Sequence, residues 1–386
     1  MNVEYAPMTS HRSSAATDVI IRAGELDDLN ALVHIEESCF DSDRLSRRSF
    51  RHFLKNGKGA LLVCVTGGQI AGYVLVHVHS GTALARLYSF AVLPDLQGRG
   101  LGRPLLEAGE VAARKQGCLA IRLEVRRDNE RVKQLYVNAG YREFEQLEDY
   151  YEDHEDAIRL EKPLVRADNR EIMQVPYYQQ SLEFTCGPAA LMMAMKRLNP
   201  NLMLNRKLEL QIWREATTIF MTSGLGGCAP DGLALAAYRR GFNVELILKD
   251  EQALFVDSVR SVEKKEVVAL VHEDFQEQIA AANIKVRYGS VRVQELKKVI
   301  HQGGVPVVLI SSYRLYGEKI PHWVVVTDVR DDIIYLHDPY VDYEENRISM
   351  DCMNIPILSE EFEGMARYGR SGHRAVVIVK KRRSRV

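Results

Sequence analysis

Two motifs that build different kinds of site lie in separate halves of this 386-residue chain. The first is the glycine-rich run Q-G-R-G-L-G at residues 97–102, and the second is Cys186, followed far along the chain by His322 and Asp338. A glycine-rich turn presents backbone N–H groups to a phosphate, whereas a thiol with a base and an orienting acid is a nucleophile. The length and the two motifs together predict a two-domain enzyme, with about 150 to 200 residues in each domain.

The composition is typical of a globular protein. Hydrophobic residues make up 46% and charged residues 27%, and the formal net charge of -1 gives no basic field for nucleic acid. The apolar runs have the length of strands and fall short of the roughly 20 residues of a membrane span. Residues 1–18 are polar and lack the apolar core of a signal peptide, which predicts a disordered leader. The six cysteines are dispersed without a C-x-x-C pair, which favours a reducing cytoplasm over a disulfide framework or a zinc site.

Residues 19–164 alternate strand and helix patterns, which predicts a mixed α/β domain. We expect strands at 19–22, 60–66, 69–77, 85–93 and 119–125, helices at 27–38, 46–55, from 101 onward and at 130–139, and a closing hairpin between 141 and 160.

Residues 165–175 are polar, and their hydrophobic residues follow neither the helix nor the strand period, so we expect a short linker there. In the second domain, at 176–380, we expect helices at 188–198 and 231–240, then strands at 267–271, 305–310, 323–329, 333–337 and 375–379. Helices followed by strands predict an α+β fold. Residues 381–386 are expected to form a solvated basic tail.

The glycine-rich loop lies between a strand and a helix, where loop amides and the helix dipole can hold a pyrophosphate. A dinucleotide-binding fold normally places such a loop after its first strand, whereas this loop follows about four. The strand L-Y-S-F-A-V at 87–92, the loop, and the run R-R-D-N…L-Y…G-Y at 126–141 resemble the GNAT acetyltransferases over residues 19–164. The stretch L-E-V-R at 123–126 is similar to the ribosomal-protein alanine acetyltransferases of that family.

The resemblance implies a GNAT fold, acetyl-CoA as cosubstrate and an amine acceptor. It implies that the strand before the loop pairs with the pantetheine arm and that the loop holds the pyrophosphate. It also implies that Tyr136 protonates the departing thiolate and that Glu124 is the general base. The cofactor-binding residues it implies are Phe90, Ala91, Val92, Gln97, Gly98, Arg99, Gly100, Leu101, Gly102, Arg103 and Asn129.

The sequence leaves a second reading open for each of these roles. Tyr136 is either the acid or a packing residue on its helix, and Glu124 is either the base or a surface strand carboxylate. An acidic run over residues 143–156 lies where the family places its acceptor-side hairpin. It either favours a cationic amine or is a solvated face.

Cys186 is predicted at the N-terminus of a helix, where the helix dipole and a nearby imidazolium favour the thiolate. Gln180, six residues earlier, is placed to form an oxyanion hole with the Cys186 N–H. A three-residue connection at 330–332 would leave His322 diagonal to Asp338 on one face of a hairpin, whereas a two-residue connection would put them on opposite faces. His337 is a rival base that points to the opposite face.

The elements Q…C-G-P-A, H-W and D-P resemble the papain-like clan, in particular the bacteriocin-processing cysteine peptidases, over residues 174–380. The resemblance implies a papain-like fold and a catalytic set of Cys186, His322, Asp338 and Gln180. The chain lacks the transporter membrane domain that those peptidases usually carry, so peptidase, amidase and acyl-transfer chemistry all remain open.

We therefore expect a cytoplasmic bifunctional enzyme that acetylates an amine, such as a peptide or protein N-terminus, and hydrolyses a peptide or amide bond. The alternative is that the second domain is an inactive peptide-binding module that presents the acceptor to the transferase. The five cysteines other than Cys186 are expected to be buried hydrophobes. His77 and His79 lack a third ligand, so no metal is expected. The sequence leaves the oligomeric state open.

Overall fold

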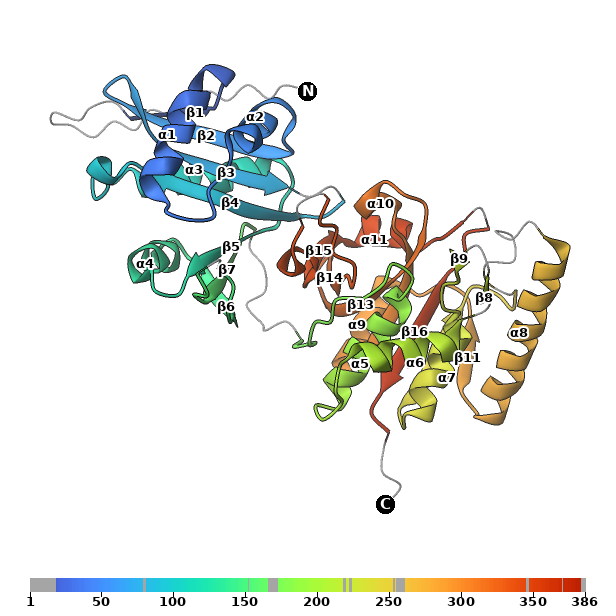
Figure 1. Cartoon of the computed structure of the whole chain (residues 1–386). Helices are drawn as coiled ribbons and strands as arrows, with labels where there is room; N and C mark the ends of the chain where they lie inside the picture. Colours follow the sequence, from blue (N-terminus) through green and yellow to red (C-terminus); the bar gives the residue numbers. More distant parts are fainter. Residues whose placement is uncertain are drawn as a thin grey trace. The chain divides into compact units, whose positions relative to one another are not determined.

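The computed structural model describes residues 19–78, 81–151, 153–165, 173–217, 220–221, 224–252, 254, 261–344, 347–369 and 371–382. The chain divides into two compact units, Met1–Ala167 and Asp168–Val386 (Figure 1). The predicted leader at 1–18, most of the predicted linker and residues 383–386 of the predicted tail lie outside the described residues.

The first unit is built on a seven-stranded sheet in the order β1-β2-β3-β4-β5-β7-β6. All neighbours are antiparallel except β4 and β5. The strands are β1 Val19–Ala23, β2 Gly59–Thr66, β3 Gln69–Val78, β4 Leu84–Val92, β5 Ala120–Arg126, β6 Arg142–Leu147 and β7 Ala157–Pro163. The helices are α1 Leu29–Cys39, α2 Arg47–Asn56, α3 Gly102–Lys115 and α4 Glu130–Asn138, with short 3-10 helices at Leu26–Asp28 and Pro94–Leu96.

Two cores cover the two faces of this sheet. Leu32, Phe50 and Tyr73 belong to the core under α1 and α2, and Leu105, Val74 and Tyr136 belong to the core under α3 and α4. Val74 follows Tyr73 directly, so the period-2 alternation of β3 serves both faces. The predicted helices and strands of residues 19–164 all form, with bounds that differ by at most three residues.

Strands β4 and β5 separate after a short parallel contact. They pair from Leu84 with Ala120 to Arg86 with Arg122, and the rest of β4 pairs only with β3 among the described strands. A bulge places Tyr88 as an extra residue, because Val76 pairs with Leu87 and Leu75 with Ser89. Figure 1 shows β5, β6 and β7 turned away from β4. The separation leaves the β4 backbone from Tyr88 to Val92 without a strand on the β5 side.

The second unit is built on another seven-stranded sheet, in the order β11-β10-β16-β12-β13-β14-β15. Its strands are β10 Asn243–Leu248, β11 Lys285–Tyr288, β12 Val305–Ser311, β13 Pro321–Arg330, β14 Ile333–His337, β15 Ile355–Leu358 and β16 Ala375–Lys380, and β8 Phe220–Met221 and β9 Gly224–Leu225 form a separate hairpin. Its helices are α5 Cys186–Leu198, α6 Arg206–Ala216, α7 Pro230–Arg239, α8 Val262–Ala281, α9 Val293–His301, α10 Tyr313–Tyr316 and α11 Ser359–Met365, with a 3-10 helix at Ser349–Cys352.

Strand β12 shows how this sheet divides the second unit into layers. Val305, Val307 and Leu309 pack in the core with α5, α6 and α7, whereas Val308 and Ile310 pack in the core with α9 and α11. Because both faces are covered, β12 is an almost continuous apolar run. Helices α6, α8, α9 and α11 and strands β10, β11 and β15 lie where the sequence predicted no such element.

The strand predicted at 267–271 is wrong, because these residues lie inside α8. Their five-residue apolar run fits either a strand or a buried stretch of helix, and length decides between the two. Val268, Phe275 and Ile279 are buried, whereas Val267 and Leu270 are exposed, which is burial on one side of a helix. No helix in the described part of the chain is long and apolar enough to cross a membrane.

Two candidate active sites

The glycine-rich loop joins the end of β4 to the start of α3. Gly98 and Gly100 have φ values of +78° and +80°, which lie in the left-handed region that favours glycine. A Cβ on Gly100 would meet no atom within 4 Å, so its backbone conformation, and not a lack of space, calls for glycine. No side chain caps the N-terminus of α3, which leaves the first N–H groups of the helix for a ligand.

The predicted cofactor-binding residues surround this loop. Ala91, Val92 and Leu101 are buried, Phe90 and Gly102 are half-buried, and Gln97, Gly98, Arg99, Gly100, Arg103 and Asn129 are exposed. Gln97 Nε2 donates to Val92 O at 3.0 Å, which ties the loop back to the strand end. Asn129 caps α4, because its side-chain oxygen accepts from Val132 N–H at 3.2 Å. The uncovered edge of β4 fits the pantetheine arm of acetyl-CoA. The left-handed loop and the uncapped helix fit its pyrophosphate.

Tyr136 lies on the inner face of α4 with 4% of its surface exposed. Its ring centroid is 6.3 Å from that of Phe90 and 5.4 Å from that of Tyr141. Burial raises the pKa of Tyr136 above its ordinary value of 10. The hydroxyl is therefore protonated at neutral pH, as a proton donor must be.

Glu124 lies on β5 between two buried arginines. Its Oε2 accepts from Arg86 Nη2 at 3.1 Å, and its Oε1 is 3.6 Å from Arg159 Nε. Both carboxylate oxygens of Glu124 therefore face a guanidinium group. The predicted role of Glu124 as general base therefore requires an ammonium acceptor to displace part of this pairing.

Much of the acidic run on the β6–β7 hairpin is paired within the first unit. The ion pairs, with their N···O distances, are Arg159 with Glu145 at 2.6 Å, Arg127 with Asp156 at 2.8 Å, Arg126 with Asp153 at 2.9 Å and Lys133 with Glu143 at 3.3 Å. The charge left to attract a cationic amine is smaller than the sequence suggests.

In the second unit, Cys186 is the first residue of α5, two residues earlier than the helix start predicted at 188, and 7% of its surface is exposed. Gly187 allows this end of α5 to approach β13. A Cβ on Gly187 would lie 3.1 Å from Trp323 Cδ1 and 3.2 Å from Cys228 Cβ. All six cysteines are free thiols, and they all lie within the described ranges.

His322 is the second residue of β13 and is buried, with 7% exposed. Its Nε2 lies 2.6 Å from Asp338 Oδ1, and the ring also interacts with the Cys186 thiol. Burial lowers the pKa of His322, but the charge of Asp338, the hydrogen bond to it and the thiol contact together raise this pKa to about 10. The structure thus brings Cys186, His322 and Asp338 together.

The β13–β14 hairpin aligns His322 with Asp338 through a connection and a bulge that differ from the expected geometry. Arg330 pairs with Ile333, so the connection has two residues, Asp331 and Asp332. We expected such a connection to separate His322 from Asp338, and this was wrong. A bulge at Thr327, between Val326 and Asp328, shifts the register by one residue and returns both side chains to the same face.

Asp338 is fully buried and accepts three hydrogen bonds at its carboxylate. Oδ1 accepts from His322 and from Tyr340 N–H at 2.9 Å, and Oδ2 accepts from the Tyr316 hydroxyl at 2.5 Å. These contacts outweigh the effect of burial and lower the pKa of Asp338. Tyr316 was not predicted from the sequence, because no motif surrounds it.

Gln180 is buried near this site, but its amide has other partners. Nε2 donates to Leu182 O at 2.9 Å and to Glu183 O at 3.2 Å, which uses both of its hydrogens. An oxyanion-hole role needs at least one of these two bonds to be exchanged for a bond to the substrate.

His337, the rival base, is engaged on both ring nitrogens. Its Nδ1 accepts from Asn354 N–H at 2.9 Å, and its Nε2 donates to Val175 O at 2.7 Å. The ring therefore anchors the chain at the start of the second unit and is not available as a base.

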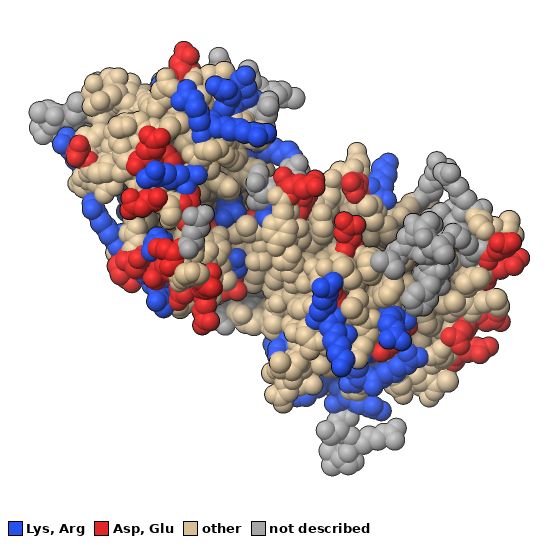
Figure 2. Space-filling view, in the orientation of Figure 1, with Lys and Arg blue, Asp and Glu red and all other residues tan. Residues whose placement is uncertain are grey.

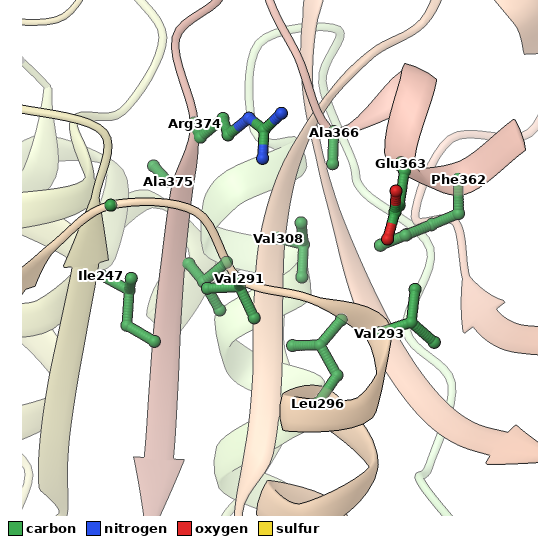
Figure 3. A pocket seen from close by; sticks show the side chains of 12 residues that line it. Ile247, Val291, Val293, Leu296, Val308, Phe362, Glu363, Ala366, Arg374 and Ala375 are labelled. Atoms are coloured by element: carbon green, nitrogen blue, oxygen red, sulfur yellow. The ribbon is translucent and has the colours of Figure 1, made fainter. Parts of the chain in front are cut away.

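Two concavities of the second unit lie apart from the thiol. A crevice of about 20 Å³ between β10, β12, β16, α9 and α11 is apolar, with Leu296, Val308 and Phe362 in its lining (Figure 3); it has room for about one water molecule. A groove of about 1320 Å³ is lined by residues that include Arg197, Arg330, Lys380 and Lys381. Figure 2 shows Lys and Arg side chains gathered at the end of the second unit where the chain terminates. Neither lining includes Cys186, His322 or Asp338.

No group of three His, Cys, Asp or Glu side chains able to hold a metal occurs in the part of the chain that the structure describes. His79 lies outside that part.

Two family models match the chain. The Acetyltransferase (GNAT) family matches residues 29–141, and the Peptidase_C39 like family matches residues 175–380, which is more than half of the chain. The mixed sheet of the first unit confirms the predicted GNAT fold. The mixed sheet of the second unit agrees with the predicted papain-like fold.

Similar proteins match the first unit. The [ribosomal protein bS18]-alanine N-acetyltransferase of Escherichia coli K12 is 33% identical over 144 residues, which are 36% of this chain and 94% of that protein. An N-alpha-acetyltransferase of Sulfurisphaera tokodaii is 27% identical over 155 residues, which are 37% of this chain and 92% of that protein. The crystal structure of the Escherichia coli ribosomal-protein-S18-alanine N-acetyltransferase covers 40% of this chain and 98% of its own, with 30% identity and a TM-score of 0.36.

Proposed function

The chain belongs to the GNAT acetyltransferase family over residues 29–141 and to the Peptidase_C39 like family over residues 175–380, and from this premise we propose a bifunctional enzyme. The first unit is an N-acetyltransferase. We propose that its acceptor is the amine of a peptide or protein N-terminus, and that the second unit is a cysteine peptidase or amidase. Two relatives of the first unit, an N-alpha-acetyltransferase and a [ribosomal protein bS18]-alanine N-acetyltransferase, support this acceptor class.

In the first unit, the β4 edge and the loop from Gln97 to Arg103 would hold acetyl-CoA, with Asn129 beside it. Acetyl-CoA supplies an activated acetyl group on a thioester. Glu124 would take a proton from the ammonium acceptor, and the free amine would attack the acetyl carbonyl carbon. Tyr136 would give its hydroxyl proton to the thiolate that departs and would take back the second proton of the amine nitrogen. The buried position of Tyr136 on α4, against Phe90 of the cofactor strand, supports this assignment.

In the second unit, the Cys186, His322 and Asp338 arrangement carries the proposal. The Cys186 thiolate attacks the carbonyl carbon of the scissile amide and forms an acyl-thioester, while the His322 imidazolium gives its proton to the leaving amine. His322 then takes a proton from water, and the resulting hydroxide attacks the thioester carbonyl carbon. The tetrahedral intermediate expels the Cys186 thiolate, which re-forms the pair with the His322 imidazolium, and the carboxylic acid product is released. Asp338 stabilises the imidazolium throughout.

The transferase half is tested with a panel of peptides and acetyl-CoA. Peptides with a free N-terminus should be acetylated at that position, and the same peptides with a blocked N-terminus and an internal Lys should not. Acetylation of lysine alone would contradict the proposed acceptor class.

The thiol half is tested by labelling with iodoacetamide and by peptide mass spectrometry of a cell extract. We expect Cys186 to be alkylated far faster than the other five cysteines, and cleaved peptides to appear with the wild type and not with Cys186→Ala. Cys228→Ala, which changes a buried neighbour, is the matched control. Slow alkylation of Cys186 would identify the second unit as an inactive peptide-binding module.

A further inference from the structure

Tyr316 is the last residue of α10, the single turn of helix between β12 and β13. Its hydroxyl donates to Asp338 Oδ2 at 2.5 Å, on the opposite oxygen from the one that His322 contacts. A hydroxyl bonded to an ionised carboxylate at this distance is a charge-assisted hydrogen bond. Tyr316 therefore contacts the orienting acid directly.

The ring of Tyr316 is fixed by its neighbours. The Arg347 guanidinium lies 4.7 Å from the ring centroid, and the rings of Tyr340 and His322 meet it edge-on at 5.1 Å and 6.2 Å. Arg347 is buried and donates to Leu315 O at 2.8 Å. A ring held on several sides keeps its hydroxyl aimed at one point.

The Asp338 carboxylate can turn about its side-chain bond unless both oxygens are bound. His322 and Tyr340 N–H bind Oδ1, so the Tyr316 hydroxyl is the donor that holds Oδ2. The titratable and charged groups around this carboxylate are His322, Tyr316, Tyr177, Arg347 and Cys352.

We propose that Tyr316 is a positioning residue of the thiol site, which orients the Asp338 carboxylate toward His322 and keeps it ionised. This inference rests on the proposed function of Cys186. The hydroxyl supports the thiolate–imidazolium pair through Asp338, so the substitution Tyr316→Phe should weaken that pair while it keeps the ring packing against Arg347.

The test is the rate of alkylation of Cys186 by iodoacetamide in the full-length protein as a function of pH. With Tyr316→Phe we expect the rate at pH 7 to fall by about 10-fold to 10²-fold, the effect of a lost hydrogen bond to a charged group. The acid limb of the profile should also move to higher pH, because a carboxylate that loses a donor is protonated more easily. Tyr313→Phe, which removes a hydroxyl from an exposed position of the same helix α10, should leave both unchanged.

A double-mutant cycle with Asp338→Asn separates positioning from packing. If Tyr316 acts through the carboxylate charge, Tyr316→Phe should have less than a threefold effect in the Asp338→Asn background. Equal effects in both backgrounds, or an unchanged pH profile in the single variant, would overturn the proposal. Slow alkylation of Cys186 in the wild type would instead overturn the proposed function of the second unit. A circular dichroism melt of each variant shows whether it folds. If Tyr316→Phe fails to fold, Tyr316→His is measured in its place, because histidine keeps a ring and a hydrogen-bond donor at this position.

Discussion

Replacing Asp338 by Asn separates the charge of the orienting acid from its shape. All three contacts of the carboxylate are donors, two at Oδ1 and one at Oδ2. The amide oxygen of Asn should take the Oδ1 position, because neither the Tyr340 N–H nor His322 Nε2–H can turn away. The amide NH₂ then faces the Tyr316 hydroxyl, which can rotate to accept. His322 would keep its orientation and its Nε2–H tautomer but lose the neighbouring negative charge.

The pKa of His322 sets the size of the effect. It is about 10 against an ordinary value of 6.5, and at about 1.4 kcal/mol per pH unit this corresponds to roughly 5 kcal/mol in favour of the imidazolium. The contact with Cys186 supplies part of that energy, so we expect Asp338→Asn to slow alkylation of Cys186 at pH 7 by about 10² to 10³. Asp338→Ala, which also loses the orientation, should be slower still.

The assay is the second-order rate of alkylation at Cys186, followed by peptide mass spectrometry between pH 5 and pH 11. In the wild type the imidazolium should persist until the pH approaches 10, whereas in Asp338→Asn it should be lost near pH 6.5 or below. Asp332→Asn, a change at an exposed position of the same hairpin, is the control. A profile of Asp338→Asn that matches the wild type would refute the assignment of Asp338 as the source of the raised pKa.

Three further predictions concern other parts of the chain. Gly100→Glu adds a side chain and a negative charge at a left-handed loop position and should abolish acetyl-CoA binding by calorimetry, whereas Gly117→Glu, at another left-handed and open position, should not. Tyr136→Phe should lower acetyl transfer about 10²-fold with little change in acetyl-CoA affinity, and an unchanged rate would make Tyr136 a packing residue only. The hydrogen bond to Asp231, opposed by burial, raises the pKa of His272 above 6.5, so its contribution to stability is complete below pH 6.5 and is lost as the pH rises through the raised value. The free energy of unfolding should therefore depend less on pH above 6.5 in His272→Gln than in the wild type. The prediction is contradicted if urea titrations give the same change in this free energy between pH 6 and pH 9 for both proteins.

Sequence patterns predicted which residues make up the thiol site but not the strand register that aligns His322 with Asp338. Cys186, His322 and Asp338 are recognisable by residue type and order, and their neighbours have clear helix and strand patterns. The bulge at Thr327 is not visible in those patterns, because both faces of β13 are apolar and a shift of one residue leaves the pattern unchanged. The register therefore depends on tertiary packing.

Other features were missed for different physical reasons. The apolar run at 267–271 is too short to distinguish a strand from a helix, and only its one-sided burial in α8 decides. The pairing of Glu124 with Arg86 and Arg159 joins residues from three strands, so no local pattern predicts it. Local periodicity predicts elements, whereas these contacts arise only when elements meet.

The position of β16 has a consequence for the order in which the chain becomes active during synthesis. This strand, formed by residues 375–380, is an interior strand of the second sheet and lies between β10 and β12. The ribosome completes residues 19–164 early, so the acetyltransferase sheet can close while the rest of the chain is still being made. The second sheet cannot close until Lys380 has emerged, because β10 has no neighbour on that side before then. The nascent chain should therefore acquire its acetyltransferase well before its thiol site, and premature termination before residue 375 should leave only the first.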